Sequence, residues 1–456
     1  MRATSIVQVS LSLSVALAAG AGLVACAEDT GDGEAVQADV QEFGTGPKLA
    51  FDEYTVLFTN PVCKKYAYTD AQDVFSNAGT RLLHKPENVF CAPSDAAASG
   101  ARDSSPQKKL VDWIADPETK EIFFTYLSFS NKVVSAELCK AVTERNVKIT
   151  MVLDRETDLS TANQVLACQP GNGDASFAPH LELRGHDATI GYAHNKVLLI
   201  NPRSEAPRIV FSSGNLTSGA VLHHENWHFI RAPARTHFAK AHVCMMDGML
   251  EHYRTKREFS TYIKACRDGA GVGEESDIKT FFVPGDGGRA GKEIQSGVRR
   301  ASFIGINAHR FSYRLLRTEL EARLASASPP AVKLIVDDDL WWAGQGTENV
   351  PNTPAEYAIV QPLAAAGVDV RYMETNQGSG YLHHNKFIVF ETPQGDSVFT
   401  GAGNFTGTAF ADNFENFYLI TIPHVVEAMK AQQEHLFALG TAQADLPTTN
   451  VRPPTH

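Results

Sequence analysis

The chain has 456 residues, of which 43% are hydrophobic and 20% charged. This composition excludes extended disorder and is sufficient for one large core or two ordinary ones. The formal net charge of −11 gives no support to non-specific nucleic-acid binding, which needs a basic surface, although a locally positive cleft remains compatible with it.

The first 25 residues have the pattern of an export signal. Arg2 precedes an apolar run at 6–24, and the run leads into Leu-Val-Ala-Cys at 23–26. This pattern predicts a lipoprotein signal peptide with Cys26 as the lipid-modified first residue of the mature protein, and cleavage after Ala27 is the alternative. We therefore expect a membrane-anchored lipoprotein of a bacterial cell envelope, or else a secreted protein. A transmembrane anchor fits less well, because the run is short and interrupted.

Residues 26–48 carry six acidic groups against one Lys and few large apolar side chains. We expect a flexible tether here. Besides Cys26, the chain has six cysteines, an even number that is consistent with three disulfides in an oxidising compartment. The simplest of the possible pairings joins sequence neighbours, giving Cys63–Cys91, Cys139–Cys168 and Cys244–Cys266.

An internal repeat organises the rest of the chain. "GYAHNKVLLIN" at 191–201 recurs as "GYLHHNKFIVFE" at 380–391, and each copy is followed by a second similar stretch, at 208–230 and 397–420. Upstream, strand-like runs flank amphipathic stretches around 131–145 and 312–325. We predict an α/β fold of two similar sandwich lobes. The expected boundaries are a first lobe at 49–266, a linker at 267–277, a second lobe at 278–440 and a tail at 441–456.

The stretch "HHENWH" at 223–228 contains H-E-x-x-H, which on a helix is the signature of a zinc peptidase. In the second copy, however, Phe414 and Tyr418 replace His224 and His228, while Glu225 is retained as Glu415. The aromatic-rich segments suit a strand better than a helix, so we do not expect a zinc site of this kind.

Each H-N-K segment precedes an apolar run and therefore reads as the start of a strand. Side chains two apart on a strand share a face, so His194 and Lys196 point together, as do His384 and Lys386, while Val197 and Leu199 pack on the core. Asn215 and Asn404 follow the next strand in similar turns. Two facing lobes would assemble two His, two Lys and two Asn, a set suited to a phosphodiester without a metal or other cofactor.

These residues resemble the phospholipase D superfamily, whose motif is H-x-K-x-x-x-x-D followed by a G-S/T-x-N turn. The resemblance covers roughly residues 85–420 and implies an active site at the lobe interface and a phosphohistidine intermediate. It implies that His194 is the nucleophile and His384 the general acid. The phosphate would be bound by Lys196, Lys386, Asn215 and Asn404.

Two departures from the family motif stand out. Asn201 and Glu391 occupy the position of the motif's Asp, where a strand would point them away from the pocket, and we expect a structural role for both. Glu225 and Glu415 are candidates for orienting the imidazoles through Nδ1, with Glu225 steering His194, and the alternative is that they cap turns.

We expect a phospholipase D-type phosphodiesterase that hydrolyses or transfers phosphatidyl groups. Its partners would be a phospholipid substrate and, through the lipid on Cys26, the membrane. Since both motif copies lie in one chain, a monomer is expected. A nuclease with the same pocket is one alternative, and the acidic balance disfavours it. An inactive binding protein of the same fold is the other alternative, motivated by Asn201 and Glu391.

Overall fold

The computed structural model describes residues 46–69, 74–75, 81–82, 84–187, 189–345, 347, 354–448 and 451–452. The predicted signal peptide, Cys26 and most of the predicted tether lie outside these residues. Within the described residues, no helix combines the length and the apolar character that a membrane crossing requires.

The first half of the chain builds a mixed sheet in the order β1-β11-β10-β9-β6-β7-β8, with β16 paired to β11. Strands β6, β7 and β8 are parallel, whereas β1, β11, β10 and β9 pair antiparallel with their neighbours. The strands are β1 (Glu53–Thr59), β6 (Glu121–Tyr126), β7 (Lys148–Asp154), β8 (His180–Arg184), β9 (Lys196–Ile200), β10 (Arg208–Ser212), β11 (His223–Arg231) and β16 (Leu382–His383).

The second half repeats this sheet in the order β12-β19-β18-β17-β13-β14-β15-β20. Its first seven strands, from β12 to β15 in this order, correspond one by one to the seven strands from β1 to β8 of the first sheet. The predicted α/β fold with two similar lobes is therefore confirmed. The strands are β12 (Ile278–Val283), β13 (Phe303–Ala308), β14 (Ala331–Asp337), β15 (Asp369–Met373), β17 (Lys386–Glu391), β18 (Ser397–Gly401), β19 (Glu415–Ile420) and β20 (Thr441–Ala442).

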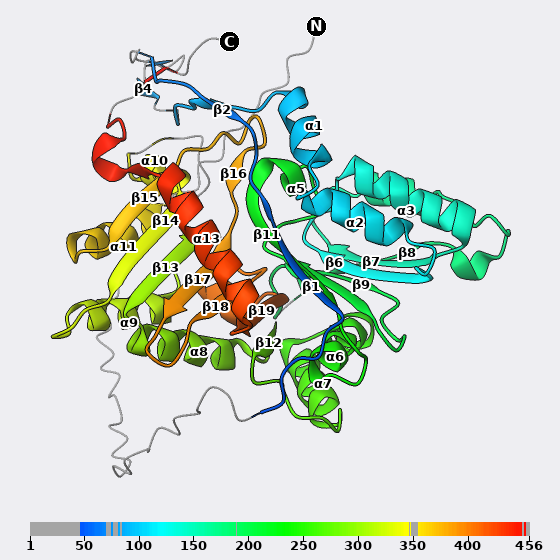
Figure 1. The fold of residues 1–456 in the computed structure, drawn as a ribbon. Coiled ribbons are helices and arrows are strands. Elements are labelled where there is room, and N and C mark those ends of the chain that lie inside the picture. The colour runs from blue at the N-terminus through cyan, green and yellow to red at the C-terminus, as the bar shows by residue number, and fades with distance from the viewer. Residues whose placement is uncertain are drawn as a thin grey trace, which may run out of the picture. The chain divides into compact units, whose positions relative to one another are not determined.

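Helices cover the sheets (Figure 1). The amphipathic stretches predicted around 131–145 and 312–325 form α3 and α9, and Asn131 caps α3 by accepting from the backbone N–H groups of Val133 and Val134. The helices of the first half are α1 (Pro93–Ala101), α2 (Pro106–Ala115), α3 (Lys132–Arg145), α4 (Ser160–Leu166), α5 (Gly219–Leu222), α6 (His237–Glu251) and α7 (Lys256–Asp268). Those of the second half are α8 (Gly287–Arg300), α9 (Arg314–Leu324), α10 (Asp339–Gly344), α11 (Pro354–Ala365), α12 (Gly407–Ala411) and α13 (Pro423–Leu439).

Three hydrophobic clusters form the core. One lies between the first sheet and α2 and α3, and another between the second sheet and α8, α9 and α11. The third combines residues of both halves, including Val197 and Leu199, as predicted, with Phe387 and Tyr418. Within it the rings of Phe211 and Tyr418 stack with centroids 3.7 Å apart. The two lobes therefore share this third cluster, and its packing fixes one sheet against the other.

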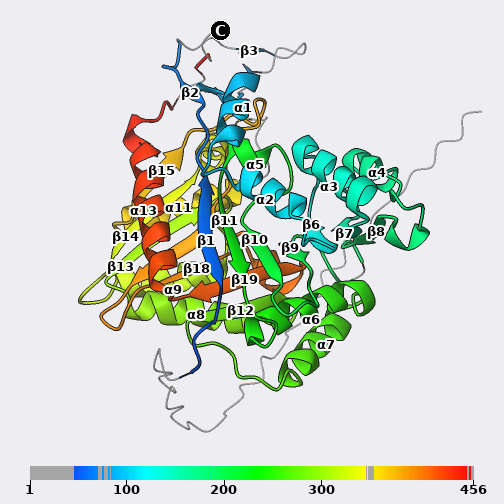
Figure 2. The same cartoon turned by 45° about the vertical axis from the view of Figure 1, so that its right-hand side comes forward.

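The lobe boundaries differ from the predicted ones. β1 lies beside β11 (Figure 2), but the chain after it crosses to the second half, where Lys65 pairs with Glu374 at 2.7 Å. The predicted linker begins inside α7, and the predicted tail begins with β20, which pairs with β15. The predicted disulfide pairing, in contrast, is confirmed for all three pairs.

Candidate active site

The two H-N-K segments enter the interface between the lobes from opposite sides. In each, the strand proper begins at the lysine, and the preceding residues pair with the other half of the chain. The backbone N–H of His194 donates to the carbonyl of Phe414 at 2.9 Å, and that of His384 donates to the carbonyl of His224 at 3.0 Å. Backbone pairing thus carries each motif histidine across to the opposite lobe.

Each motif histidine hydrogen-bonds a glutamate of the other half. His194 Nδ1 lies 2.8 Å from Glu415 Oε2, and His384 Nδ1 lies 3.0 Å from Glu225 Oε1. The predicted contact of both glutamates with imidazole Nδ1 atoms is therefore present, but the predicted pairing of Glu225 with His194 is wrong. Because a carboxylate only accepts, each Nδ1 carries a proton, which leaves Nε2 as the atom available to a substrate.

These crossed pairs define two corners of the site. The His194 corner consists of His194, Lys196, Asn413 and Glu415. The His384 corner consists of His384, Lys386, His223 and Glu225. All four motif His and Lys side chains are at least nine-tenths buried, and both glutamates are fully buried.

The lysine ammonium groups face the histidines but have different partners. Lys196 Nζ lies 3.1 Å from His194 Nε2 and 3.1 Å from the carbonyl oxygen of His194, to which it donates. Lys386 Nζ donates to the carbonyl oxygens of His384 at 2.8 Å and of Ser213, in the first half, at 3.2 Å. The second lysine thereby ties the turn that carries Asn215 to the His384 corner.

The turns that carry Asn215 and Asn404 lie against the same strands as the glutamates. A Cβ atom on Gly214 would lie 1.7 Å from Glu225 Oε2, so only glycine allows this turn to approach the carboxylate. The side-chain oxygens of Asn215 and Asn404 are buried without a hydrogen-bond partner. Among the described residues, therefore, neither side-chain oxygen has a partner, and the predicted role of both amides in binding phosphate stays a prediction.

Burial and neighbouring cations favour the uncharged forms of these groups. The pKa of His194 is lowered by burial, which the charge of Glu415 partly offsets, and it is lowered further by Lys196 and Lys386. Burial, followed by Lys386, holds the pKa of His384 well below its ordinary value. Burial also lowers the pKa of Lys196 to about 8 and that of Lys386 well below its ordinary value. An anion bound between the corners would favour the charged forms.

Two aspartates that the sequence prediction missed hold the histidine segments from behind. Asp154 Oδ2 accepts the backbone N–H of Ala193 at 2.8 Å, and Asp337 Oδ2 accepts that of His383 at 3.0 Å. Both carboxylates are buried at the carboxyl ends of equivalent strands, β7 and β14. The repeated acidic residue after an apolar run, in "VKITMVLD" and "VKLIVDDD", was the available signal.

The H-E-x-x-H stretch is not a zinc peptidase site. Residues 223–231 form strand β11, on which positions four apart are separated by roughly 13 Å. His224 Nε2 lies 2.7 Å from the hydroxyl of Tyr381, and His228 Nδ1 lies 3.0 Å from that of Tyr54. The stretch nevertheless contributes Glu225 and, unforeseen, His223 to the site.

Asn201 and Glu391 lie away from both corners, as predicted. The side-chain oxygen of Asn201 accepts backbone N–H groups of Lys120 and Glu121 at 2.8 and 3.0 Å. Glu391 Oε1 lies 3.0 Å from Lys430 Nζ. Both side chains thus connect the far ends of their strands to neighbouring segments.

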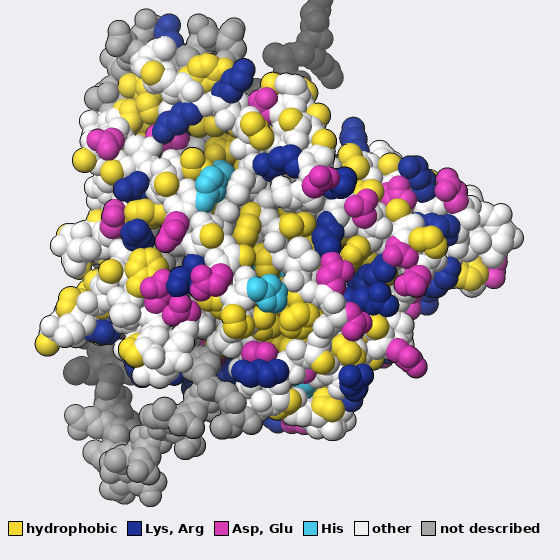
Figure 3. Space-filling model, in the orientation of Figure 1, with side chains coloured by type: hydrophobic (Ala, Val, Ile, Leu, Met, Phe, Trp, Pro, Cys, Tyr) yellow, Lys and Arg dark blue, Asp and Glu magenta, His cyan; other side chains and the backbone are white. Residues whose placement is uncertain are grey.

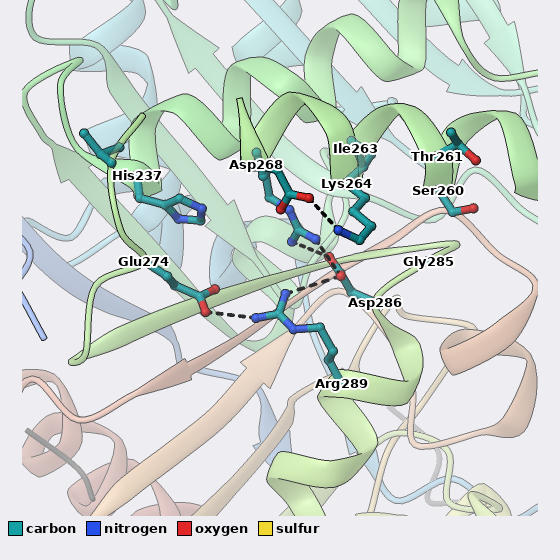
Figure 4. A pocket seen from close by; sticks show the side chains of 12 residues that line it. His237, Ser260, Thr261, Ile263, Lys264, Asp268, Glu274, Gly285, Asp286 and Arg289 are labelled. Carbon is teal, nitrogen blue, oxygen red and sulfur yellow. Dashed lines mark hydrogen bonds and ion pairs between the residues drawn. The ribbon is translucent and has the colours of Figure 1, made fainter. Parts of the chain in front are cut away.

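A cavity of about 680 Å³ lies elsewhere, between α7 and the start of α8 (Figure 4). Four of its charged side chains form ion pairs: Asp286 is paired with Arg267 at 2.5 Å, and Arg289 with Glu274 at 2.9 Å. None of the sequence-predicted catalytic residues lines it. We therefore assign the chemistry to the two corners and not to this cavity.

Comparison with known proteins places these features in context. The family model "Cardiolipin synthase, PLD-like domain" matches residues 304–437. Mitochondrial cardiolipin hydrolase of Xenopus laevis is 35% identical over 106 residues, which make up 23% of this chain and 41% of that relative. The crystal structure of phosphatidylserine synthase from Haemophilus influenzae superposes with a TM-score of 0.51 at 13% identity, covering 74% of this chain and 84% of that one. This last likeness concerns the fold alone.

Proposed function

The chain belongs to the phospholipase D superfamily, and on that premise we propose that it hydrolyses or transfers phosphatidyl groups through a phosphohistidine intermediate. The observation that carries the proposal is the pair of crossed His–Glu contacts, at 2.8 and 3.0 Å. They fix two imidazoles in one tautomer, with the proton on Nδ1 and Nε2 unprotonated, and Lys196 Nζ lies 3.1 Å from His194 Nε2. One imidazole then serves as nucleophile and the other as proton donor.

In the first step, His194 Nε2 attacks phosphorus while His384, entering as the imidazolium, gives its Nε2 proton to the departing oxygen. The phosphorus–oxygen bond to the alcohol breaks, and a phosphohistidine forms on His194. In the second step, water or an acceptor alcohol attacks phosphorus and gives its proton to His384. The phosphorus–nitrogen bond to His194 breaks, and both histidines are restored. Glu415 and Glu225 stabilise the positive charge that each imidazole acquires.

The phosphoryl oxygens would be held by Lys196, Lys386, Asn215 and Asn404, which donate as negative charge accumulates. The anionic phosphodiester adds negative charge between the corners, and this raises the lowered pKa values of the histidines and lysines. Substrate binding would therefore supply the imidazolium form of His384 that the first step needs.

Phospholipids are the substrate class that the comparisons support. The matching family model is named for cardiolipin synthase, and the curated relative is named a cardiolipin hydrolase. In Figure 3, basic and acidic side chains intermingle over the visible face without a continuous basic tract, and the net charge is −11. Neither observation favours nucleic acid as substrate.

We further propose that the protein is an exported lipoprotein, anchored through Cys26 and active as a monomer. Three disulfides in the described residues are typical of proteins that fold in an oxidising compartment. A lipid anchor would keep the interface between the lobes close to its substrate.

The test is to incubate the full-length protein, in the presence of EDTA, with each of three substrates in turn: phosphatidylcholine, cardiolipin and single-stranded DNA. We expect release of choline or phosphatidic acid that is lost in His194→Ala. The matched control is His180→Ala, which removes an exposed histidine that pairs with Glu182 at 2.7 Å, and it should be fully active. Cleavage of DNA alone would move the assignment to a nuclease, and abolition of all activity by EDTA would contradict the proposed chemistry.

A further inference from the structure

The two corners differ at one position of the repeat. Two residues before each glutamate stands His223 in one corner, at the start of β11, and Asn413 in the other, just before β19. His223 Nδ1 lies 3.1 Å from Glu225 Oε1, and Asn413 Nδ2 donates to Glu415 Oε1 at 3.0 Å. The His384 corner therefore offers two imidazoles and a carboxylate, where the His194 corner offers one imidazole, an amide and a carboxylate.

From this difference we propose that His223, Glu225 and His384 form a binding site for a divalent transition-metal ion such as Zn²⁺, and that occupancy inhibits the enzyme. Two imidazole nitrogens and one carboxylate oxygen are a donor set that Zn²⁺ prefers, with a fourth position left to water. A side-chain amide donates through its nitrogen and is a poor replacement, so the His194 corner lacks an equivalent site.

The donor atoms of the three residues lie within 4.8 Å of one another. Both Nδ1 atoms address the same oxygen, Glu225 Oε1, at 3.1 and 3.0 Å, and the two rings are inclined at 65°. Donors at ordinary zinc distances in a tetrahedron lie roughly 3.3 Å apart. The ion would enter between the nitrogens and the oxygen after small shifts, and it would displace the two Nδ1 protons into solvent.

The surroundings hold the donors in place and leave a way in. Glu225 is fully buried, and its other oxygen, Oε2, accepts from Trp227 Nε1 at 3.2 Å, so that Oε1 stays directed at the imidazoles. The side chain of His223 is 13% exposed, compared with 8% for that of His384. An ion can therefore reach the site along the His223 side.

Inhibition follows from the proton that the metal replaces. An imidazole with a metal on Nδ1 cannot hold protons on both nitrogens, so His384 could not act as an imidazolium toward the leaving oxygen. The inhibition rests on the proposed phosphodiesterase function, whereas metal binding does not depend on it.

Binding is tested by titrating ZnCl2 into the metal-free full-length protein by isothermal titration calorimetry. We expect one high-affinity ion per chain, with a Kd raised at least tenfold in His223→Asn and unchanged in His180→Ala. X-ray absorption of the loaded protein should report imidazole ligands and oxygen. An unchanged Kd in folded His223→Asn, checked by circular dichroism, would overturn the inference.

The repeat provides the reciprocal variant. Asn413→His places the same trio at the His194 corner and should add a second high-affinity ion. Failure to add one in a folded variant would also contradict the geometric argument.

Inhibition is tested in activity assays. The Zn²⁺ concentration that halves each variant's own activity should be at least tenfold higher for His223→Asn than for the unmodified protein. Zinc binding without any phospholipid cleavage would reject the proposed function alone, and cleavage that saturating Zn²⁺ leaves unaffected would reject the inhibition.

Discussion

The His194 corner and the His384 corner occupy equivalent places in two sheets of the same strand order, but their surroundings have diverged. Glu415 is flanked by the neutral donor Asn413, and Glu225 by His223, a second imidazole. Tyr126 and Ala308 pair with Lys196 and Lys386, so the next residues, Leu127 and His309, are equivalent too. The ring of His309 lies 4.8 Å from that of His384, whereas Leu127 cannot exchange a proton.

This difference shows that the repeat preserved the strand order and the predicted site residues, His, Lys, Asn and Glu, in both halves. The groups around one histidine became rich in exchangeable protons, while those around the other did not. Such a division suits a nucleophile in the His194 corner and a proton donor in the His384 corner. The expected outcomes below test that division, beginning with the largest effect.

Replacing either motif histidine should reduce kcat by about 10²- to 10⁴-fold with natural phospholipids, because each removes a covalent or proton-transfer step. The two variants should differ in their activity toward a 4-nitrophenyl phosphodiester, because 4-nitrophenolate leaves without needing a proton. His384→Ala should then release 4-nitrophenol in a rapid first turnover, after which phosphoenzyme should accumulate on His194, because the second step still needs His384 to accept a proton. His194→Ala should remain inactive, and the opposite result would exchange the two roles.

Replacing the glutamates tests the crossed contacts, with an expected loss of about 10²-fold in kcat for each, since a neutral amide no longer stabilises an imidazolium. Because Glu225 contacts His384, Glu225→Gln should release 4-nitrophenol in the same rapid first turnover as His384→Ala. Glu415→Gln should behave like His194→Ala. If Glu225→Gln instead followed His194→Ala, the crossed arrangement would be contradicted.

The two aspartates behind the histidine segments should differ in their effect on stability. Asp154→Asn weakens a buried acceptor of the Ala193 N–H and should lower the free energy of unfolding by about 1–3 kcal/mol and kcat by about tenfold. Burial, and then the charge of Asp339, raise the pKa of Asp337, so the fold disfavours its ionised form relative to an exposed carboxyl group. Asp337→Asn should cost less, as measured by urea unfolding and kcat.

The smallest effect concerns the alkaline limb of the pH profile. Lys196 loses its proton as the pH rises through its pKa of about 8. Half a pH unit above this pKa, kcat/KM should therefore be about fourfold lower than its plateau value. Between about 8 and the ordinary value of 10.5, the folded chain holds fewer protons than the unfolded one, so the contribution of Lys196 to the unfolding free energy rises with pH there. Lys196→Arg should shift the fall in kcat/KM to higher pH.

The repeat alone allowed much of this molecule to be predicted. The apolar run after H-N-K placed His194 and Lys196 at a strand start, and comparison of "HENWHFI" with "FENFYLI" showed that the first is a strand. Cysteines close in sequence paired as expected. In each case the determining interactions lie within about thirty residues along the chain, where periodicity and spacing are informative.

The crossed contacts could not be predicted, because they depend on how one sheet packs on the other. Sequence proximity favoured Glu225 for His194, but the pairing of β11 with β16, through His223 and Leu382, brings His384 to Glu225 instead. The packing of residues 64–69 and 84–90 was missed for the same reason. Lys85 forms ion pairs with Asp338 and Asp339 at 2.6 and 2.7 Å, partners more than 250 positions away.

The crossed pairs also determine when the molecule acquires its chemistry. A folded first half would hold His194 without Glu415, and a folded second half would hold His384 without Glu225. Neither half alone contains a complete corner, so docking of the halves is the event that creates the catalyst. The appearance of activity during refolding would therefore time the closure of the lobe interface, and an emerging chain with only one finished lobe would be chemically inert toward the lipids around it.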